Sequence, residues 1–471
     1  MAKMTPEEAK AYVEELMARA HKAQKVAEKF IQERVDELVG AIAYEMTRED
    51  VKAELAEIAL KETELGDIPS KIGKIQKKVK GVYRDIKNKK TVGVCEEYPE
   101  RGLRRMYKPV GVVGALVPST QPEMLPICTA LFAIKARDAV VMSPHPRGKK
   151  TTNLTVDKIR AILKKYDAPE DLLICADENH VNLHVTNEIM AQSDLVVATG
   201  GAGMVKAAYS SGTPAYGVGA GNDNVVCDDT ADLKFAAHTT HVSKIADLAA
   251  GCSCDNSLVI FESVYDEMVA NLKAEGGYLC NEEEKAKFQK ALFPNWPNDN
   301  VINRDMVAKP IDVLAKLAGV ELPEGTEFIM VEETGSGFDY PLSGEKLCLI
   351  VTLYRAKDLD DAIRIVNANQ AYSGAGHGAC IYTTNDDNLI KFAAETYTSR
   401  VNCNLPNSQA NTGTWEAGYP FSPSLGCGTW GGNSASENVD LKYYMNNTWI
   451  AVPIDGKEPT DEELFGDLVL R

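Results

Sequence analysis

Between residues 111 and 211 the chain alternates short, continuous apolar runs with amphipathic helical patterns. The apolar runs cover residues 111–118, 138–144, 171–177 and 194–201, and a helical pattern follows each of them. A strand without a polar side belongs in a parallel sheet that helices cover on both faces. The sequence therefore predicts a doubly wound α/β unit, in which ligands bind beyond the carboxyl ends of the strands.

A second α/β block follows after about residue 230. Its predicted strands are 257–261, 327–333, 347–354 and 379–384, with helices between them. The chain has 471 residues, of which 44% are apolar, and this is enough for two or three domains with at least one large core. We expect the first unit to end near residue 228.

A helical stretch is predicted from Thr5 to about residue 46. Thr5 is a suitable cap, Pro6 takes the first helical position, and Glu8 stands three residues after the cap. Apolar residues at helical spacing continue the pattern, with one or two breaks. Because the opposite face is strongly charged, the pattern favours helices packed on a domain over membrane or partner helices.

Charge and apolar patterning exclude two classes of partner. The chain has 51 basic and 68 acidic residues, a net charge of −17, and no basic run that would bind a phosphate backbone. No apolar stretch approaches the roughly 18 residues needed to cross a bilayer, and residues 1–10 lack the apolar core of a signal peptide. We expect no nucleic acid, no membrane, no targeting peptide and a cytoplasmic location.

Two of the 11 cysteines, Cys252 and Cys254, stand one residue apart. The cysteines are scattered through a long chain without secretory context, which favours free thiols. No second Cys or His pair lies at zinc-finger spacing, so we expect no metal site. Cys252 follows a helix-to-loop transition among small residues, as a thiolate nucleophile does. Taken alone, the pattern fits an inert buried cysteine better.

Two glycine-rich segments, 200–205 and 217–222, are candidates for phosphate binding. Gly200, Gly201 and Gly203 follow a predicted strand and open a helix, where backbone N–H groups can face a phosphate or pyrophosphate. Neither segment has the full G-x-G-x-x-G fingerprint after the first strand. Tight turns that need positive φ angles explain these glycines equally well.

Polar side chains also stand where ligands of such folds bind. Ser143, His145 and Arg147 come at the end of a predicted strand, where a ribose or its phosphate could be held; the alternative is a solvated loop. His377 lies between glycines just before another predicted strand. A lone histidine is more often structural than catalytic, but these glycines leave room for a ligand.

Seven stretches, in the same order along nearly the whole chain, resemble the CoA-acylating aldehyde dehydrogenases of the aldehyde dehydrogenase superfamily. They are residues 108–122, 138–150, 196–222, 243–257, 344–354, 374–382 and 423–439. The resemblance implies an α/β fold of two doubly wound αβα domains with a small β oligomerisation arm. It further implies a nicotinamide cofactor-binding domain at 1–228 with the arm at about 91–110, a catalytic domain at 229–438, and a C-terminal oligomerisation segment at 439–471.

The resemblance also implies a mechanism. Cys252 takes the place of the family's nucleophile, and Cys254 falls where relatives carry another residue. The Cys252 thiolate would attack an aldehyde, a backbone N–H would hold the oxyanion, and the thioester formed by hydride transfer would pass its acyl group to coenzyme A. Hydrolytic relatives need a general-base Glu, whereas 217–222 has no carboxylate. A coenzyme A thiol is more acidic than water and can do without that base.

Further roles follow by the same resemblance. Glu345 would hold the nicotinamide ribose or assist proton transfer, and His377 would lie near the acyl-transfer site. The cofactor, NAD or NADP, would contact Ser143, His145 and Arg147 with its adenosine half and Gly200, Gly201 and Gly203 with its pyrophosphate. Relatives usually carry Asn at the position of Gln121. The family is oligomeric, which implies a homodimer or homotetramer.

The substrate indications conflict. Residues 330–347 and 252–261 resemble the sulfoacetaldehyde-acylating group, whereas 404–413 resembles the acetaldehyde enzymes. Sulfoacetaldehyde is the preferred substrate, with acetaldehyde and succinate semialdehyde as alternatives. A sulfonate needs Arg, Lys or amide donors; Arg400 is available but belongs to the general family motif. A hydrolytic aldehyde dehydrogenase and a non-catalytic nucleotide-binding protein are the other functions considered.

Overall fold

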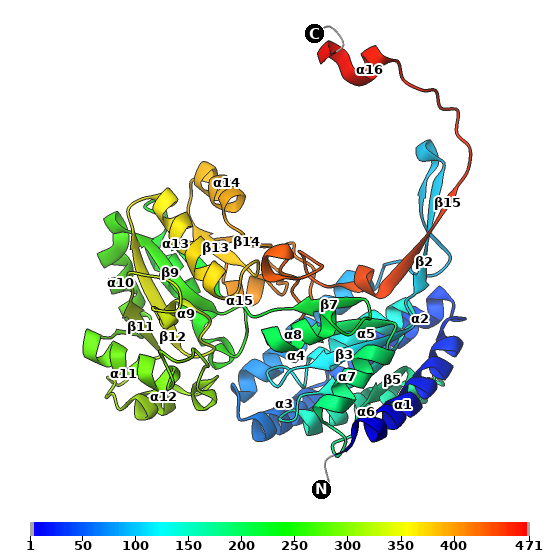
Figure 1. Cartoon of the computed structure of the whole chain (residues 1–471), viewed down its shortest axis with the longest axis horizontal. Coiled ribbons are helices and arrows are strands. Elements are labelled where there is room, and N and C mark those ends of the chain that lie inside the picture. The colour runs from blue at the N-terminus through cyan, green and yellow to red at the C-terminus, as the bar shows by residue number, and fades with distance from the viewer. Residues whose placement is uncertain (1–3, 469–471) are drawn as a thin grey trace.

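A computed structural model describes residues 4–468 of the chain (Figure 1). Thr5 caps the first helix through a capping box with Glu8, and a single break at residues 28–31 divides the helical stretch predicted up to residue 46. Residues 1–3, where no targeting peptide is expected, lie outside the described residues. The N-terminal helices are α1 (Pro6–Ala27), α2 (Gln32–Met46), α3 (Glu49–Thr63) and α4 (Ile68–Ile86).

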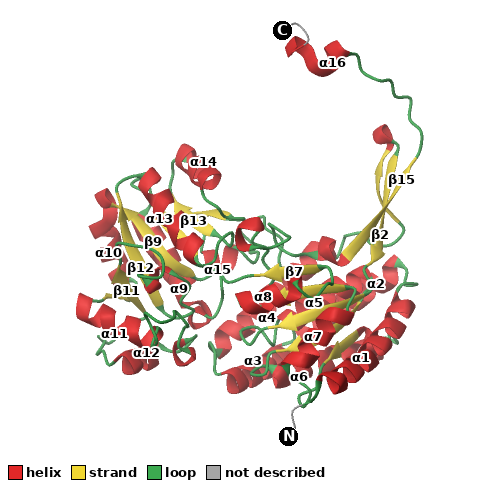
Figure 2. Cartoon of the chain, viewed as in Figure 1, coloured by secondary structure: helices red, strands yellow, loops and turns green. Residues whose placement is uncertain are grey.

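The four apolar runs and one further strand form the first sheet. Its neighbours pair in parallel in the order β5-β4-β3-β6-β7, and helices cover it (Figure 2). The strands are β3 (Val112–Val117), β4 (Ala139–Pro144), β5 (Leu173–Cys175), β6 (Leu195–Thr199) and β7 (Ala215–Val218). The helices between them are α5 (Leu125–Ala136), α6 (Lys149–Lys165), α7 (Leu183–Gln192) and α8 (Ala202–Tyr209).

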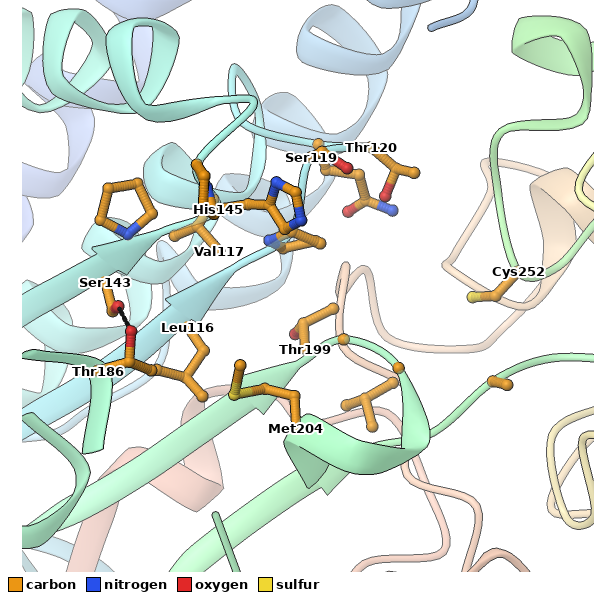
Figure 3. Close-up of a pocket in the computed structure, with 18 of the residues that line it drawn as sticks. Leu116, Val117, Ser119, Thr120, Ser143, His145, Thr186, Thr199, Met204 and Cys252 are labelled. Atoms are coloured by element: carbon orange, nitrogen blue, oxygen red, sulfur yellow. Dashed lines mark hydrogen bonds between the residues drawn. The ribbon is translucent and has the colours of Figure 1, made fainter. Parts of the chain in front are cut away.

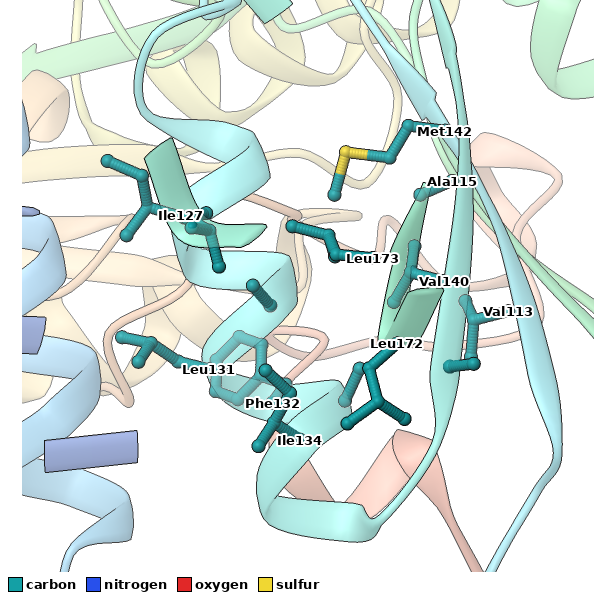
Figure 4. Packing of buried hydrophobic residues seen from close by; sticks show 14 of the residues in the cluster. Val113, Ala115, Ile127, Leu131, Phe132, Ile134, Val140, Met142, Leu172 and Leu173 are labelled. Carbon is teal, nitrogen blue, oxygen red and sulfur yellow. The ribbon is translucent and has the colours of Figure 1, made fainter. Parts of the chain in front are cut away.

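Helix α5 lies at the centre of this unit's core. All 12 of its residues are buried, because α2, α4 and α6 pack around it and the sheet covers its remaining side. Leu131 and Phe132 of α5 share one apolar cluster with Val113 and Val140 of the sheet (Figure 4). The core thereby fixes the first residues of α4 and α5 relative to the carboxyl ends of the strands.

The second sheet is also parallel, in the order β10-β11-β12-β9-β8-β13-β14. Its strands are β8 (Asp223–Cys227), β9 (Asp255–Phe261), β10 (Gly277–Leu279), β11 (Phe328–Glu332), β12 (Ile350–Ala356), β13 (Ala379–Tyr382) and β14 (Val401–Cys403). Its helices are α9 (Leu233–Ile245), α10 (Tyr265–Ala274), α11 (Glu282–Leu292), α12 (Ile311–Ala318), α13 (Leu359–Tyr372), α14 (Asp386–Glu395) and α15 (Asn407–Ala410).

Strand β8 lies before the expected end of the first unit at residue 228, yet it pairs with β9 and β13. The chain therefore changes sheets between β7 and β8, at residues 219–222. The sequence placed this change too late because a short apolar strand carries no sign of which sheet it joins.

The predicted arm at 91–110 contains β1 (Val94–Tyr98) and β2 (Leu103–Pro109), which pair antiparallel. β15 (Met445–Ala451), from the segment 439–471, pairs antiparallel with β2 along its whole length. Beyond β15 the chain extends away from the body toward α16 (Asp461–Phe465) (Figure 1). Within residues 4–468, no helix combines the length and the apolar character that a membrane span requires.

Candidate active site

Cys252 lies between the two α/β units, in the loop that joins the 3₁₀ helix η3 (Ala246–Ala249) to β9. Three successive residues of η3, Asp247, Leu248 and Ala249, have left-handed φ angles of 50°, 52° and 61°. This conformation costs a residue with a side chain about 1–2 kcal/mol. The loop that carries Cys252 therefore depends on contacts that hold it in place.

Helix α4 and the turn before it supply these contacts. The carboxylate of Asp247 is paired with Lys74 of α4, and the ammonium of Lys71 lies 3.8 Å from the same carboxylate. Gly66 fits closely against Asp247, since a Cβ there would lie 1.8 Å from the carboxylate. The N-terminal helices of the first unit thus fix the shape of the Cys252 loop.

Cys252 ends a buried chain of polar contacts. Nε2 of His377 lies 3.1 Å from Sγ of Cys252, and Nδ1 of His377 lies 2.7 Å from Oδ1 of Asp223. The other oxygen of Asp223 accepts a hydrogen bond of 2.6 Å from the side-chain amide of Asn411. His377, Asp223 and Asn411 are all buried. A thiol, an imidazole and a carboxylate are therefore aligned as in enzymes with a cysteine nucleophile.

Sheet topology explains this alignment. Asp223 is the first residue of β8, and His377 stands two residues before β13, its parallel neighbour in the sheet. Both side chains consequently lie at the amino ends of adjacent strands. The loop before β9, the other neighbour of β8, brings Cys252 to the same edge.

The surroundings of His377 favour its charged form. Burial by itself lowers the pKa of the imidazole, but the charges of Asp223 and Cys252 and hydrogen bonds to both raise it well above the ordinary value. An imidazolium next to a cysteine stabilises the thiolate, which is the nucleophilic form.

Cys254 is in a different environment. Its side chain is buried, and burial raises the pKa of its thiol to about 12. Its sulfur lies 3.8 Å from the carbonyl oxygen of Ala246, and the structure has both Cys252 and Cys254 as free thiols. Cys254 therefore stays protonated at neutral pH.

A cleft of about 470 Å³ extends from Cys252 across the carboxyl ends of the first sheet (Figure 3). The loops after β3, β4, β6 and β7 form most of its wall, as expected for a doubly wound unit. Of the residues predicted for cofactor binding, the cleft is lined by Ser143, His145, Gly200, Gly201 and Glu345.

Two of the residues predicted for cofactor binding, Arg147 and Gly203, do not line the cleft. The guanidinium of Arg147 instead donates a hydrogen bond of 2.7 Å to the carbonyl oxygen of Thr63, which holds the side chain against the N-terminal helices. Gly203 is exposed on the first turn of α8. In the cleft wall, Ser143 and Thr186 share a hydrogen bond of 2.8 Å (Figure 3), while burial and then the charge of Arg147 lower the pKa of His145.

The start of α8 fits the phosphate groups of a dinucleotide. No side chain caps this helix, and a Cβ on Gly201 or Gly203 would meet open space. Gly201 and Gly203 are exposed, and the helix dipole favours an anion at the helix start.

Glu345 lines the same cleft near Cys252. The backbone N–H of Gly221 donates a hydrogen bond of 3.1 Å to its carboxylate. Burial nevertheless raises the pKa of Glu345 to about 7. Its carboxyl group is therefore able to exchange a proton near neutral pH.

The segment 217–222 offers no carboxylate to Cys252 and has no room for one at two of its glycines. A Cβ on Gly221 would lie 1.9 Å from the carbonyl oxygen of Cys252, and a Cβ on Gly217 would lie 2.5 Å from the side chain of Val205. Gly221 therefore permits close packing over the Cys252 loop, and Gly217 permits close packing against α8.

A second cavity, of about 70 Å³, also reaches Cys252 and shares Gln121 and Pro423 with the cleft. Arg400 lines neither cavity; its guanidinium donates to Gly426 and Asn438. The other residues that line the small cavity are Lys74, Lys78, Met124, Ala246, Gly251, Ser253, Cys254, Ser408 and Thr412.

Within residues 4–468, one group has the spacing of a metal site. It consists of His238, His241 and Glu275, where Nδ1 of His238 lies 3.0 Å from the carboxylate of Glu275. His241 also contacts Glu327 at 2.7 Å. None of these residues lines the cleft or the small cavity, so the group is separate from Cys252.

Sequence reasoning missed Asp223. This carboxylate directly follows the segment 217–222, which corresponds to the general-base segment of hydrolytic relatives. Sequence reasoning also missed Lys74 and Lys78, which are four residues apart and so share one face of α4. Two lysines on the inner face of an otherwise amphipathic helix were the available signal, because apolar positions such as Ile75, Val79 and Val82 place that face in the core.

The chain belongs to the aldehyde dehydrogenase family, since residues 2–279 match the model of that family. Its relatives lie within the CoA-acylating class. It is 38% identical, over 97% of this chain and 98% of the relative, to a sulfoacetaldehyde dehydrogenase (acylating) of Bilophila wadsworthia. It is 37% identical, over 96% of this chain and 99% of the relative, to a succinate-semialdehyde dehydrogenase (acetylating) of Clostridium kluyveri.

A crystal structure of an acetylating aldehyde dehydrogenase from Geobacillus thermoglucosidasius superimposes with a TM-score of 0.91, at 32% identity over 97% of this chain and 99% of the other. These similarities confirm the predicted fold and the prediction of an acylating aldehyde dehydrogenase. The class defines the cofactors: a nicotinamide dinucleotide accepts the hydride, and coenzyme A accepts the acyl group.

Proposed function

We propose that this acylating aldehyde dehydrogenase converts sulfoacetaldehyde to sulfoacetyl-CoA through a thioester on Cys252. The observation that carries the proposal is the contact of Cys252 with the buried His377–Asp223 pair. This arrangement supports a thiolate at a position reached by both the cleft and the small cavity.

In the first step, the thiolate of Cys252 adds to the aldehyde carbon and forms a thiohemiacetal. The backbone N–H of Cys252 donates to no protein acceptor among the described residues, so it is available to the oxyanion. The nicotinamide, when bound, supplies the hydride acceptor for oxidation to the thioester. In its imidazolium form His377 pairs with the thiolate before the attack, and its proton is available for transfer after the attack.

In the second step, the thiol of coenzyme A attacks the thioester carbon, and the Cys252 thiolate leaves. The attacking thiol must lose a proton, and His377 is within contact of the sulfur to be released. The lack of a carboxylate in 217–222 favours this exchange over hydrolysis, because water is much the weaker acid and needs a stronger base.

The cofactor assignments are proposals of the same kind. The first sheet unit would bind the nicotinamide dinucleotide, with Ser143 and His145 at its adenosine half, and the second unit would carry the catalytic groups. Gly200, Gly201 and Gly203 would face the pyrophosphate at the start of α8, which their open surroundings support. The guanidinium of Arg147 would reach the cofactor only if its hydrogen bond to the carbonyl oxygen of Thr63 were broken.

The choice of sulfoacetaldehyde has two supports. One is similarity to a sulfoacetaldehyde dehydrogenase (acylating), and the other is the presence of Lys74 and Lys78 in the small cavity, where a sulfonate needs cationic or amide donors. Acetaldehyde carries no group that would use these lysines. Succinate semialdehyde carries an anion too, so the experiment must include it.

The test is a substrate panel of sulfoacetaldehyde, acetaldehyde and succinate semialdehyde with coenzyme A and either NAD or NADP. We expect the highest kcat/KM for sulfoacetaldehyde, with acyl-CoA as the product identified by mass spectrometry. Cys252→Ala should abolish the reaction, while the matched variant Cys254→Ser should retain it. Free acid formed without coenzyme A would show a hydrolytic enzyme instead, and a higher kcat/KM for another aldehyde would refute the substrate.

A further inference from the structure

The small cavity beside Cys252 contains a buried lysine without a counter-ion. Lys78 is 7% exposed, and its ammonium donates a hydrogen bond of 2.8 Å to the carbonyl oxygen of Gly413. Lys74, on the same face of α4, is paired with Asp247. Lys78 has no such ion pair with any residue between 4 and 468. Its other contacts, the carbonyl oxygen of Gln409 at 3.5 Å and the ring of Phe421 at 5.5 Å, carry no net charge, so a buried ammonium here lacks a negative partner.

The carboxylates near α4 contact its other lysines. Lys71 lies 3.8 Å from both Glu123 and Asp247, and Lys74 is paired with Asp247, whereas Lys78 contacts no carboxylate within residues 4–468. Burial and then the positive charge of neighbouring Lys77 lower the pKa of Lys78 well below its ordinary value. An anion in the cavity would act in the opposite direction and favour the ammonium form.

Three hydroxyl groups that line the same cavity also lack partners. The side-chain oxygens of Ser253, Ser408 and Thr412 are buried and make no hydrogen bond among the described residues. A buried polar atom without a partner is uncommon in a native structure, and three around one small cavity indicate a missing polar ligand. Each of these three cavity hydroxyl groups can donate one hydrogen bond.

We propose that Lys78 and the three cavity hydroxyl groups bind the anionic group of the aldehyde while its carbonyl carbon stands at Cys252. This inference rests on the proposed function, because it takes an aldehyde to react at Cys252. It assigns to Lys78 the selection of charged over uncharged aldehydes.

The dimensions and the donors favour a short sulfonate. A cavity of about 70 Å³ equals the liquid volume of roughly two water molecules, which suits a small anionic group. One ammonium and three hydroxyl donors match the three oxygens of a sulfonate better than the two of a carboxylate. A sulfonate is the anion of a strong acid, so it also keeps its charge at every pH near neutral.

The experiment compares Lys78→Met, Lys78→Arg and the matched control Lys77→Met. Lys77 is the adjacent residue, does not line the cavity, and bonds to Gln409 at 2.9 Å. We expect Lys78→Met to lower kcat/KM for sulfoacetaldehyde about 10- to 100-fold, the usual worth of a hydrogen bond to a charged group, mainly through KM. Its kcat/KM for acetaldehyde should not fall, Lys77→Met should not lower kcat/KM for either aldehyde, and Lys78→Arg should recover part of the loss.

A binding measurement makes the inference independent of turnover. Ethanesulfonate, which has no carbonyl group, should protect Cys252 of the wild type from alkylation by iodoacetamide, and uncharged ethanesulfonamide should not. Protection should be lost in Lys78→Met and kept in Lys77→Met. If the wild type made no acyl-CoA from any aldehyde, the proposed function would be wrong while this binding could still be read.

Several outcomes would overturn the inference. Equal losses of kcat/KM for sulfoacetaldehyde and acetaldehyde in Lys78→Met would show a structural role for the lysine. Unchanged protection by ethanesulfonate in that variant would show that the anion binds elsewhere. Stronger protection by propionate than by ethanesulfonate would refute the assignment of a sulfonate.

Discussion

The imidazole of His377 lies between a thiol that it can charge and a carboxylate that keeps it charged. Asp223 is buried, and within residues 4–468 its side-chain oxygens accept one hydrogen bond each, from His377 and from Asn411. Its charge therefore acts mainly on the imidazole, at 2.7 Å and away from water. We assign Asp223 a positioning role, because it acts on Cys252 through His377.

Asp223→Asn tests this role. The variant keeps the shape of the side chain but removes the charge, so His377 should be less often protonated and the Cys252 thiolate less populated. We expect alkylation of Cys252 by iodoacetamide at neutral pH to slow by about tenfold or more, since a hydrogen bond to a charged group contributes about 1.5–3 kcal/mol. Mass spectrometry of the labelled peptide measures the rate, with Cys252→Ala as the blank. An unchanged rate across the pH range would contradict the role.

Glu345 gives a prediction for the pH dependence of the reaction. Its pKa of about 7 means that the carboxyl group is protonated below that pH and ionised above it. If the ionised form assists the reaction, kcat/KM should rise with pH through about 7, and Glu345→Gln should lack this rise. The measurement is the pH profile of both enzymes at saturating nicotinamide cofactor. A rise that persists unchanged in Glu345→Gln would assign it to another group.

The same shift in the pKa of Glu345 affects stability. Between the ordinary value of 4.5 and about 7, the native protein holds a proton that the unfolded chain has released. The contribution of this carboxyl group to the free energy of unfolding therefore falls as pH rises through that window. Urea unfolding of the wild type and Glu345→Gln should show a smaller fall with pH in the variant.

Among the elements, α4 has two functions at the active site. Through Lys74 it contacts Asp247, which belongs to the run of left-handed residues before Cys252, and through Lys78 it lines the small cavity. The helix is itself fixed by apolar residues packed in the first unit's core. One helix therefore relates the position of the nucleophile to that of the substrate.

Asp247→Asn should break the buried ion pair with Lys74 and release the strained loop. Leaving one charge of such a pair without its partner costs about 3–5 kcal/mol in the free energy of unfolding, which urea denaturation measures. Acyl-CoA formation should fall at the same time, because Cys252 is no longer held against His377. Asp50→Asn, at an exposed position that contacts Arg48, is the matched control and should leave the urea midpoint unchanged. A normal stability of Asp247→Asn would contradict the role of α4.

The elements show how far the sequence can lead. Continuous apolar runs predicted the parallel first sheet and four strands of the second sheet, since they report directly on burial, and the family resemblance led to Cys252, Glu345 and His377. The contacts of Asp223 and Lys78 could not be predicted in the same way, because they join residues 154 or more positions apart: Asp223 meets His377 across neighbouring strands of the second sheet, and Lys78 of the first unit meets Gly413. The side-chain direction of Arg147 likewise depends on Thr63, which no local pattern indicates.

At the scale of the whole molecule, the arm sheet and the C-terminal segment are the parts that reach away from the body (Figure 1). The segment after β15 exposes a series of apolar side chains: Val452, Ile454, Leu464, Phe465 and Leu468. Exposed apolar side chains at this density indicate a protein surface that another chain covers. We propose that β15 and the segment after it pair subunits of a homodimer or homotetramer.

Removal of residues 445–471 tests this proposal. The truncated chain loses β15 and the apolar segment, so it should be monomeric by light scattering, whereas the full chain should be a dimer or tetramer. Removal of residues 466–471 alone keeps β15 and most of the apolar side chains and serves as the control. Equal masses for the full chain and the larger truncation would contradict the proposal.

The placement of Lys78 has a consequence for how such enzymes diversify. The side chain that would recognise the tail of the aldehyde comes from α4, whereas Cys252, His377 and Asp223 come from the second sheet unit. A change at position 78 can therefore alter the preferred aldehyde while leaving the thioester chemistry in place. A single substitution in this helix would convert an enzyme for charged aldehydes into one for uncharged aldehydes, or the reverse. The catalytic groups would be kept at every step.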